Sequence, residues 1–229
     1  MSYLSPPDAP ASLTEQATSL LRRAILTAAL APGDTLSETQ AADQLGLGKA
    51  PIRAALARLA EEGLIQAMPR RGWVVALVTI RDIHEVFDLR LLLEPEAARR
   101  AAGRVDADAL RRLDAVCAAG YRPDDAESAL AFLDANRAFH VAVADLSGNG
   151  RLARQIGRLL DESTRMLVLG LKRRDRTGEM AHEHAALIEA LALGRADAAA
   201  AMMHEQVAAS RAMVLDALTS APSGLPVLP

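Results

Sequence analysis

Apolar residues recur at helical spacing in three successive segments near the N-terminus. The first segment runs from Leu13 to about residue 28 and is stopped by a Pro-Gly pair. The second follows Ser37, which forms a capping-box pattern with Gln40 three residues later. The third covers about residues 50–62 and ends at Gly63. The pattern therefore predicts three short helices, with a short turn between the second and the third.

After the third helix the pattern changes to two short extended runs, at residues 64–68 and 73–76. A turn with Pro69 and Gly72 lies between them, and this arrangement predicts a β-hairpin. Another short extended piece ends at Leu36. Three helices followed by a hairpin is the order of a winged helix-turn-helix, in which the hairpin is the wing.

Beyond Val78 the apolar spacing is helical throughout, with short breaks that contain Gly, Pro or Asp. Helices are expected at residues 79–102, 106–119, 125–147, 150–170, 177–193 and 196–219. Six antiparallel helices form a bundle. We therefore expect a mainly α protein with a winged helix-turn-helix over 13–77, an all-α six-helix bundle over 78–220, and flexible tails at 1–12 and 221–229.

The composition agrees with this pattern, because the chain has 48 Ala and 35 Leu against 19 Val plus Ile and six aromatic residues. Ala and Leu favour helices and β-branched and aromatic residues favour strands, so a sheet-dominated fold is excluded. No run of eighteen apolar residues is free of charge, and the first ten residues lack the pattern of a secretory signal. The single Cys117 excludes an internal disulfide and a cysteine-based zinc site. These features predict a soluble cytoplasmic protein without a membrane partner.

Positive charge is concentrated in one stretch, although the formal net charge of −3 does not indicate a nucleic-acid partner. Residues 46–76 carry five basic side chains against two acidic ones. In a helix-turn-helix, the second helix of the pair reaches base edges with its N-terminal residues. Here Lys49 and Arg53 lie opposite the apolar face of that helix, and both residue types donate to guanine or phosphate. The candidate DNA-binding residues are Ser37, Thr39, Lys49, Ala50, Arg53 and Arg58 and, in the wing, Arg70, Arg71 and Gly72.

Three blocks of this half form one long motif: Gly33-x-x-Leu36-x-Glu38, Pro51-Ile52-Arg53-x-Ala55-Leu56-x-Arg58-Leu59-x-x-Glu62-Gly63-Leu64-Ile65 and Pro69-x-Arg71-Gly72-x-x-Val75. Together they closely resemble the DNA-binding domain of the GntR family of bacterial transcription regulators. The family usually has Ser-Arg-Thr where this chain has Gly48-Lys49-Ala50, and a Glu where it has Ala54. The side-chain hydroxyls of the family's Ser and Thr are thus missing, and the ammonium group of Lys49, a point charge, replaces a bidentate guanidinium. The resemblance implies the family's docking mode with a different operator sequence or affinity.

Five polar residues interrupt the apolar stripes of the predicted bundle: Arg90, Asn136, His140, His184 and Gln206. One polar residue on an apolar face is commonly a core residue with a satisfied hydrogen bond. Several in one bundle indicate a polar ligand pocket instead. We name these five as candidate effector-binding residues.

The bundle half contains the pieces Arg90-x-x-Leu93-Glu94, Asn136-x-x-Phe139-His140, Ser147-Gly148-Asn149 and Glu183-His184-x-x-Leu187-Ile188-x-Ala190-Leu191. They resemble the FCD ligand-binding domain of the FadR-type branch of the family, and six helices resemble its shorter, VanR-like subgroup. Many members hold a divalent metal with an Asp, a His four residues later, and one His on each of two later helices. The resemblance places the metal ligands at Asn136, His140, His184 and Gln206.

Two of these four positions are imidazoles, which suit an ion of the zinc or nickel type, and two are neutral amides, which are poor ligands for it. The alternative is that the same four residues and Arg90 bind an organic effector directly. Histidine donors and an arginine favour a carboxylate-bearing metabolite, such as an organic or sugar acid.

The sequence therefore predicts a metabolite-responsive DNA-binding transcription regulator rather than an enzyme. We expect a homodimer, because a two-fold protein matches the half-sites of a palindromic double-stranded operator. Repression relieved by the effector is the expected mode. The alternative is a metal-dependent enzyme that uses His140 and His184. Against it, the sequence has no His-Glu-x-x-His motif and no Ser or Cys nucleophile with a paired base.

Overall fold

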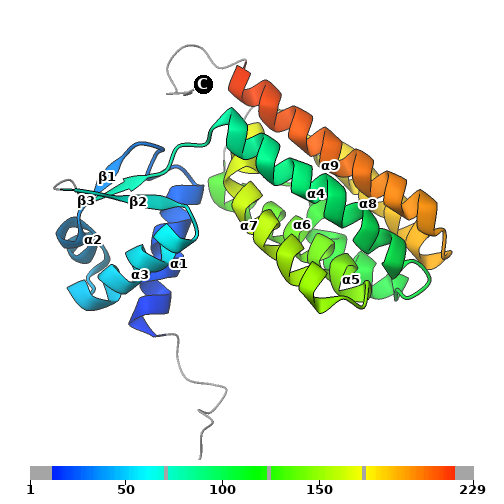
Figure 1. Cartoon of the computed structure of the whole chain (residues 1–229), viewed down its shortest axis with the longest axis horizontal. Helices are drawn as coiled ribbons and strands as arrows, with labels where there is room; N and C mark the ends of the chain where they lie inside the picture. Colours follow the sequence, from blue (N-terminus) through cyan, green and yellow to red (C-terminus); the bar gives the residue numbers. More distant parts are fainter. Residues whose placement is uncertain (1–11, 70–71, 123–124, 172–173, 220–229) are drawn as a thin grey trace, which may run out of the picture. The chain divides into compact units, whose positions relative to one another are not determined.

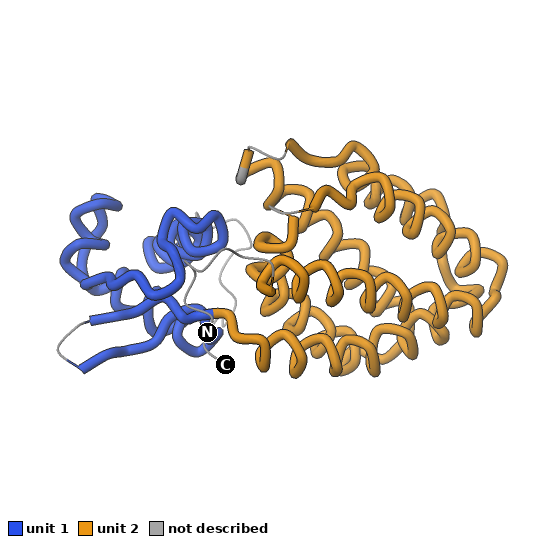
Figure 2. Tube along the Cα trace, turned by 90° about the horizontal axis from the view of Figure 1, so that it is seen from above, with its two compact units in different colours: residues 1–77 blue, residues 78–229 orange. Residues whose placement is uncertain are grey.

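The computed structural model describes residues 12–69, 72–122, 125–171 and 174–219. The chain divides into two compact units, residues 1–77 and 78–229 (Figure 2). The described part of the first unit contains α1 (Leu13–Leu26), β1 (Thr35–Leu36), α2 (Glu38–Leu45), α3 (Lys49–Glu61), β2 (Ile65–Met68) and β3 (Gly72–Val75). That of the second contains α4 (Ile80–Ala101), α5 (Ala107–Ala119), α6 (Ala126–Leu146), α7 (Gly150–Leu171), α8 (Thr177–Ala192) and α9 (Ala196–Thr219).

The fold class is as predicted, a winged helix-turn-helix followed by a helical bundle. The tails predicted at 1–12 and 221–229 lie outside the described residues, except for Ser12. That residue belongs to the first helix, because its hydroxyl accepts a hydrogen bond from the backbone N–H of Glu15. No helix of the described ranges is both long and apolar enough to cross a membrane.

Local sequence signals set the helix ends in the first unit. Ser37 and Gln40 form the predicted capping box, since the Ser37 hydroxyl accepts from the Gln40 N–H and the Gln40 side chain accepts from the Ser37 N–H. Helix α2 ends at Gly46, which adopts a left-handed conformation with φ of 64°. Helix α3 starts after Gly48 without a side-chain cap. The missing family hydroxyl therefore leaves this helix start without a side-chain hydrogen bond.

The wing belongs to an antiparallel sheet with the strand order β1-β3-β2. In the predicted hairpin, Met68 pairs with Gly72 next to the turn. The extended piece ending at Leu36 adds β1, whose Leu36 pairs with Trp73. Gly72 has a φ of 82°, and a Cβ at this position would lie 2.8 Å from the carbonyl oxygen of Leu36. The close approach of β1 to β3 thus requires glycine here.

The core of the first unit is apolar and joins α1, α2, α3 and the sheet. Its central side chains on α3 are the predicted ones, Ile52, Leu56 and Leu59, all fully buried. Lys49 and Arg53 lie on the exposed side of the same helix. The predicted division of α3 into a buried and an exposed face is confirmed.

The second unit is a bundle of long helices, in which α4 and α9 run side by side (Figure 1). Helix bounds agree with the predicted ranges to within about a residue. Helix α4 likewise begins at a reciprocal capping box, between Thr79 and Asp82. The first unit ends at Leu77, so α4 is the first helix after the connection between the two units in the sequence.

Candidate functional site

The N-terminal part of α3 presents an exposed face with Lys49, Ala50 and Arg53. Arg53 extends from this face, but its guanidinium is paired with Glu38 of α2. Arg53 Nε lies 3.0 Å from both carboxylate oxygens of Glu38, and Nη2 lies 2.8 Å from Oε2. Arg53 must therefore exchange Glu38 for a base or a phosphate if it contacts DNA.

The other predicted DNA-binding residues are distributed more widely. Arg58 lies at the far end of α3, where its Nε is 3.7 Å from Glu62, which also pairs with Arg22 of α1. Thr39 is exposed, whereas the Ser37 hydroxyl is used by the cap of α2. Glycine is required at position 72 because a Cβ there would crowd the carbonyl oxygen of Leu36. Arg70 and Arg71 lie outside the described residues.

All six helices of the bundle contribute buried polar side chains to what we call the polar core. It comprises Arg90 and Glu94 of α4, Asp114 of α5, Asn136 and His140 of α6, Ser163 of α7, Arg176 next to the start of α8, His184 of α8 and Gln206 of α9. Each of these residues is less than a tenth exposed. The five polar residues predicted from the sequence all belong to this set.

A continuous network runs from α7 through α4 to α6. Arg90 Nη1 donates to the Ser163 hydroxyl at 3.2 Å, and Arg90 Nε donates to Glu94 Oε1 at 2.6 Å. The other oxygen of Glu94 lies 2.6 Å from His140 Nδ1. Burial alone raises the pKa of Glu94, but Arg90 and His140 outweigh burial and lower this pKa to about 2. Glu94 is therefore ionised and can only accept, so His140 Nδ1 donates to it.

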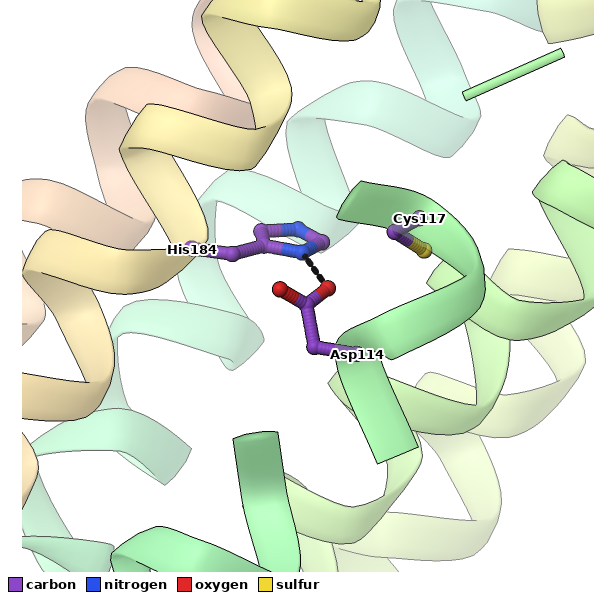
Figure 3. Close-up of side chains that lie close together, drawn as sticks. All are labelled: Asp114, Cys117 and His184. Carbon is purple, nitrogen blue, oxygen red and sulfur yellow. Dashed lines mark hydrogen bonds and ion pairs between the residues drawn. The ribbon is translucent and has the colours of Figure 1, made fainter. Parts of the chain in front are cut away.

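His184 has a carboxylate partner of its own, Asp114, as Figure 3 shows. Its Nδ1 lies 2.6 Å from Asp114 Oδ1, and Cys117 follows on the same helix as Asp114. Burial lowers the pKa of His184 although the bond to Asp114 opposes this shift. A neutral His184 with its proton on Nδ1 leaves Nε2 as an acceptor. The ring of His184 stacks on Phe139 at 4.1 Å and lies 5.6 Å from that of His140.

Three buried atoms of the polar core have no hydrogen-bond partner among the described residues: Asn136 Oδ1, Gln206 Oε1 and Arg176 Nη1. Gln206 Nε2 donates to the carbonyl oxygen of Glu183 at 2.9 Å. Arg176 uses its other nitrogens, with Nε donating to Glu179 at 2.7 Å and Nη2 to Glu183 Oε1 at 2.6 Å. Buried polar atoms are nearly always hydrogen-bonded in folded proteins, so these three atoms are exceptions that call for an explanation.

Comparisons with known proteins agree with this division of the chain. The description "FCD domain" matches residues 85–209, and "Bacterial regulatory proteins, gntR family" matches residues 13–75. The chain belongs to the GntR family. Its FCD domain contains every residue of the polar core.

Relatives and solved structures extend the likeness. The regulator YdhC of Bacillus subtilis is 25% identical over 176 residues, which are 74% of this chain and 76% of YdhC. A regulator from the TAR-I region of Agrobacterium vitis is 37% identical over 82 residues, 36% of this chain and only 48% of that protein. The structure of McbR/YncC of Escherichia coli has a TM-score of 0.73 at 23% identity and covers 90% of this chain and 99% of its own. This last likeness shows the fold.

Membership of the GntR family makes this protein a DNA-binding transcription regulator and not an enzyme. The alternative of a metal-dependent enzyme that uses His140 and His184 is therefore wrong. Both histidines use Nδ1 in a hydrogen bond to a buried carboxylate. Such bonds fix the orientation of an imidazole that binds a ligand through Nε2.

FCD domains can bind metals, and a metal needs ligand atoms of suitable charge and number. At the four positions implied by the resemblance, His140 and His184 offer imidazole nitrogens, but Asn136 and Gln206 offer only amide oxygens. Zinc and nickel sites of this kind use carboxylate or further imidazole ligands. The set contains no anionic ligand and does not fit a tightly held ion of that type.

A different trio, Asp114, Cys117 and His184, brings three potential metal-ligand atoms within 4.8 Å of one another (Figure 3). These groups bond to their neighbours instead. His184 donates to Asp114, and the Cys117 thiol lies 3.7 Å from the carbonyl oxygen of Phe132. Burial and the neighbouring Asp114 raise the pKa of Cys117 to about 12, so it is held as a thiol.

Four members of the polar core were not among the predicted site residues: Glu94, Asp114, Ser163 and Arg176. The signal for Asp114 was available, because Leu110, Asp114 and Cys117 follow the spacing of one buried helix face. Arg176 stands in a charged stretch before α8, which resembles a solvent-exposed loop. Its burial follows from tertiary packing alone.

Proposed function

We propose that this GntR-family protein is a homodimeric repressor that a small carboxylate-type metabolite releases from a palindromic operator. The observation that carries the proposal is the polar core. A bundle that served only as a dimerisation scaffold would be more stable with apolar side chains at these buried positions. Polar side chains from all six helices, three of them with unpartnered atoms, are what a ligand-binding site requires.

Helix α4 supports the coupling between effector and DNA. It is the first helix after the DNA-binding unit in the sequence, begins at Ile80, and carries Arg90 and Glu94 in the polar core. We propose that the effector changes the hydrogen bonds of these two residues and thereby shifts α4. The shift biases the geometry of the two winged-helix units of a dimer through the connection at 76–82.

For the DNA contact we propose the exposed face of α3 as the reading surface, with Lys49, Ala50 and Arg53 toward the major groove. Thr39 and the wing residues Arg70 and Arg71 are proposed to contact phosphates or the minor groove. We propose that Ser37 contributes to DNA binding indirectly, by capping α2. Arg58 contributes its positive charge at the far end of α3. A protein with this role acts where the chromosome is, so we propose the cytoplasm as its location.

Two exposed leucines of α4 support a homodimer. Leu92 is 70% exposed and Leu89 is 44% exposed, and three residues of separation place them on one face of the helix. We expect Leu92→Lys to convert a dimer into a monomer in analytical ultracentrifugation and to weaken operator binding. A matched change on another helix, Leu113→Lys of α5, tests whether the effect belongs to this face. If only the α5 variant dissociates the dimer, the α4 face is not the interface.

Repression needs no further element, because a DNA-bound dimer blocks a promoter by occupying it. The test is operator binding of the full-length protein to its own upstream DNA, measured by fluorescence anisotropy with and without candidate metabolites. We expect an organic or sugar acid to lower the affinity and to be recovered unchanged. If no metabolite changes the affinity for the operator, the proposed sensing function is wrong. If the metabolite is consumed, the protein does chemistry on it.

A further inference from the structure

An open groove lies on the surface of the bundle, between α6 and α7. The two helices are joined by a short turn and pack against each other as antiparallel neighbours (Figure 1). The groove has a volume of about 320 Å³, which is enough for a small metabolite. None of its lining residues belongs to the polar core, so the groove is separate from that site. The lining consists of Arg137, Val141, Asp145, Ala153, Arg154, Gly157, Arg158 and Asp161.

The floor of the groove is apolar and is made of small side chains. Val141 of α6 lies opposite Gly157 of α7, because a Cβ at position 157 would be 3.9 Å from Val141 Cγ2. Ala153 belongs to a buried cluster of small and aliphatic side chains that joins α4, α6 and α7, and Val141 packs against this cluster. A close-packed layer of this kind gives the groove a rigid base.

Gly157 keeps the groove open in the middle of a 22-residue helix, where glycine is less favourable than alanine. Packing does not require glycine at this position. A Cβ would lie 3.7 Å from Arg137 Nη2 and 3.9 Å from Val141 Cγ2, which are ordinary contact distances. The backbone does not require it either, since Gly157 is not among the glycines with a positive φ. A glycine that weakens its helix without a packing reason favours a function for the groove.

The arginines of the groove are of two kinds. Arg137 is held by Asp161, with Nε 2.5 Å from Oδ1 and Nη2 3.0 Å from Oδ2. Arg154 and Arg158 are exposed, and neither guanidinium has a hydrogen-bond or ion-pair partner in the part of the chain that the structure describes. One helical turn separates them, so they are neighbours on the surface of α7. Two free guanidiniums at this spacing suit one dianionic group, and the planar N–H donors of arginine match phosphate.

Asp145 lines the groove two turns beyond Arg137 on α6. Its carboxylate, too, is without a side-chain partner among the described residues. An ionised carboxylate can only accept hydrogen bonds, so Asp145 suits a hydroxyl group of a ligand and repels a bare anion. The groove therefore favours a ligand that joins a phosphate to a hydroxyl-bearing body.

We infer that this groove binds a phosphate monoester of a hydroxyl-bearing compound, such as a phosphorylated sugar or polyol. Arg154 and Arg158 bind the phosphate, the organic part covers Val141 and Gly157, and Asp145 accepts from a hydroxyl group. The inference goes beyond the proposed function and does not depend on it, because the groove shares no residue with the polar core or with the DNA-binding unit.

Isothermal titration calorimetry on the full-length protein, without operator DNA, tests this ligand class. The esters are the terminal phosphate esters of glycerol, ribose and glucose, and the matched probes are the three free alcohols and inorganic phosphate. We expect at least one ester to bind about tenfold or more tightly than its alcohol and than inorganic phosphate. The inference is overturned if no ester binds. It is also overturned if inorganic phosphate binds as tightly as the esters, since the groove would then hold an adventitious ion only.

Matched variants assign the phosphate contact to its arginines. Arg154→Gln combined with Arg158→Gln should lower the affinity for the ester about tenfold or more. Arg151→Gln is the control, because Arg151 is exposed one turn before Arg154 but does not line the groove. An equal loss in the control would assign the binding to diffuse positive charge and overturn the inference. Asp145→Ala should raise the affinity for inorganic phosphate and lower the affinity for the ester. Ester binding that gains as much as phosphate binding would contradict the hydroxyl contact.

Gly157 offers a test that separates binding from stability. Gly157→Ala should raise the Tm of the ligand-free protein, since alanine stabilises a helix interior and its Cβ fits here. Gly157→Leu places a larger side chain in the groove and should abolish ester binding, while the Tm shows whether this variant is folded. Full ester binding by folded Gly157→Leu overturns the inference. Dissociation of a dimer by Arg154→Gln with Arg158→Gln in ultracentrifugation would make the groove an interface between copies of the chain, and would overturn it as well.

Discussion

The two units of this protein use buried space in opposite ways. The winged helix-turn-helix encloses a core of apolar side chains and keeps its charges on the surface, where Arg53 and Glu38 pair. The FCD bundle buries an ionised pair, Arg90 and Glu94, together with two histidines and two amides. An apolar core specifies one rigid shape at low cost. A polar core costs desolvation free energy. The contrast supports the proposal that the first unit binds DNA and the second unit senses a ligand.

The largest effect is expected from breaking the buried pair. Glu94→Ala leaves Arg90 with an uncompensated buried charge and should destabilise the bundle by about 3–5 kcal/mol. Chemical denaturation followed by circular dichroism measures this loss. The single tryptophan, Trp73 in β3, reports the first unit separately by its fluorescence. Glu62→Ala is the control, since its pair with Arg22 is partly exposed and contributes only about 0–1 kcal/mol. Equal losses in both variants would remove the contrast between the units.

The corresponding change in the first unit is Gly72→Ala. A side chain at this φ costs about 1–3 kcal/mol, and its Cβ would crowd the carbonyl oxygen of Leu36. We expect the Trp73 transition to move to lower denaturant concentration while the bundle transition stays in place. The preferred operator sequence should not change. A variant of normal stability that no longer binds its operator would instead give Gly72 a direct role at the DNA.

Lowering the pH should increase the difference in stability between the two units. His184 has a lowered pKa in the folded state, so the unfolded chain binds the proton first, and the bundle loses stability as the pH falls below about 6.5. Glu94 adds a second loss as the pH falls from 4.5 toward about 2, because its carboxylate must be protonated. The described core of the first unit has no buried histidine or carboxylate. Its Trp73 transition, measured from pH 8 to pH 2, should therefore move less. In Glu94→Gln the second loss should disappear.

The smallest effect on stability is expected at Arg53, whose side chain is mostly exposed. Arg53→Ala should leave both unfolding transitions unchanged and lower operator affinity roughly tenfold to a hundredfold if Arg53 reads a base. Arg53→Lys, the matched control, keeps the charge and loses the bidentate geometry. Glu38→Ala should raise the affinity, because Arg53 no longer has to leave a carboxylate. Unchanged binding in the Arg53 variants would exclude this residue from base recognition.

Sequence reasoning predicted the helices well because their ends depend on local chemistry. Capping boxes at Ser37 and Thr79 and a left-handed glycine at Gly46 act within one helical turn. The apolar stripe of α3 likewise needs only its own periodicity. The pairing of β1 with β3 was not predicted, because strand pairing joins residues almost forty positions apart.

The candidate site was predicted in part for the same reason. Asn136, His140, His184 and Gln206 interrupt apolar stripes, and that signal is local. Their partners were not visible in this way, since Glu94 reaches His140 and Asp114 reaches His184 across the bundle. Arg90 pairs with the buried carboxylate of Glu94 one turn away, and its contact with an effector stays a prediction. Which atoms stay unpartnered is decided only when all helices are packed.

The lone cysteine of the chain has a practical consequence. Cys117 is fully buried beside Asp114, and its thiol is held in the protonated form. A thiol reagent reacts with the thiolate, so it can label this protein only when the bundle opens around α5. The labelling rate of the unmodified protein therefore measures how often the sensing unit opens, with no introduced probe. An effector that closes the bundle should slow this reaction, which would provide a screen for the ligand without the operator.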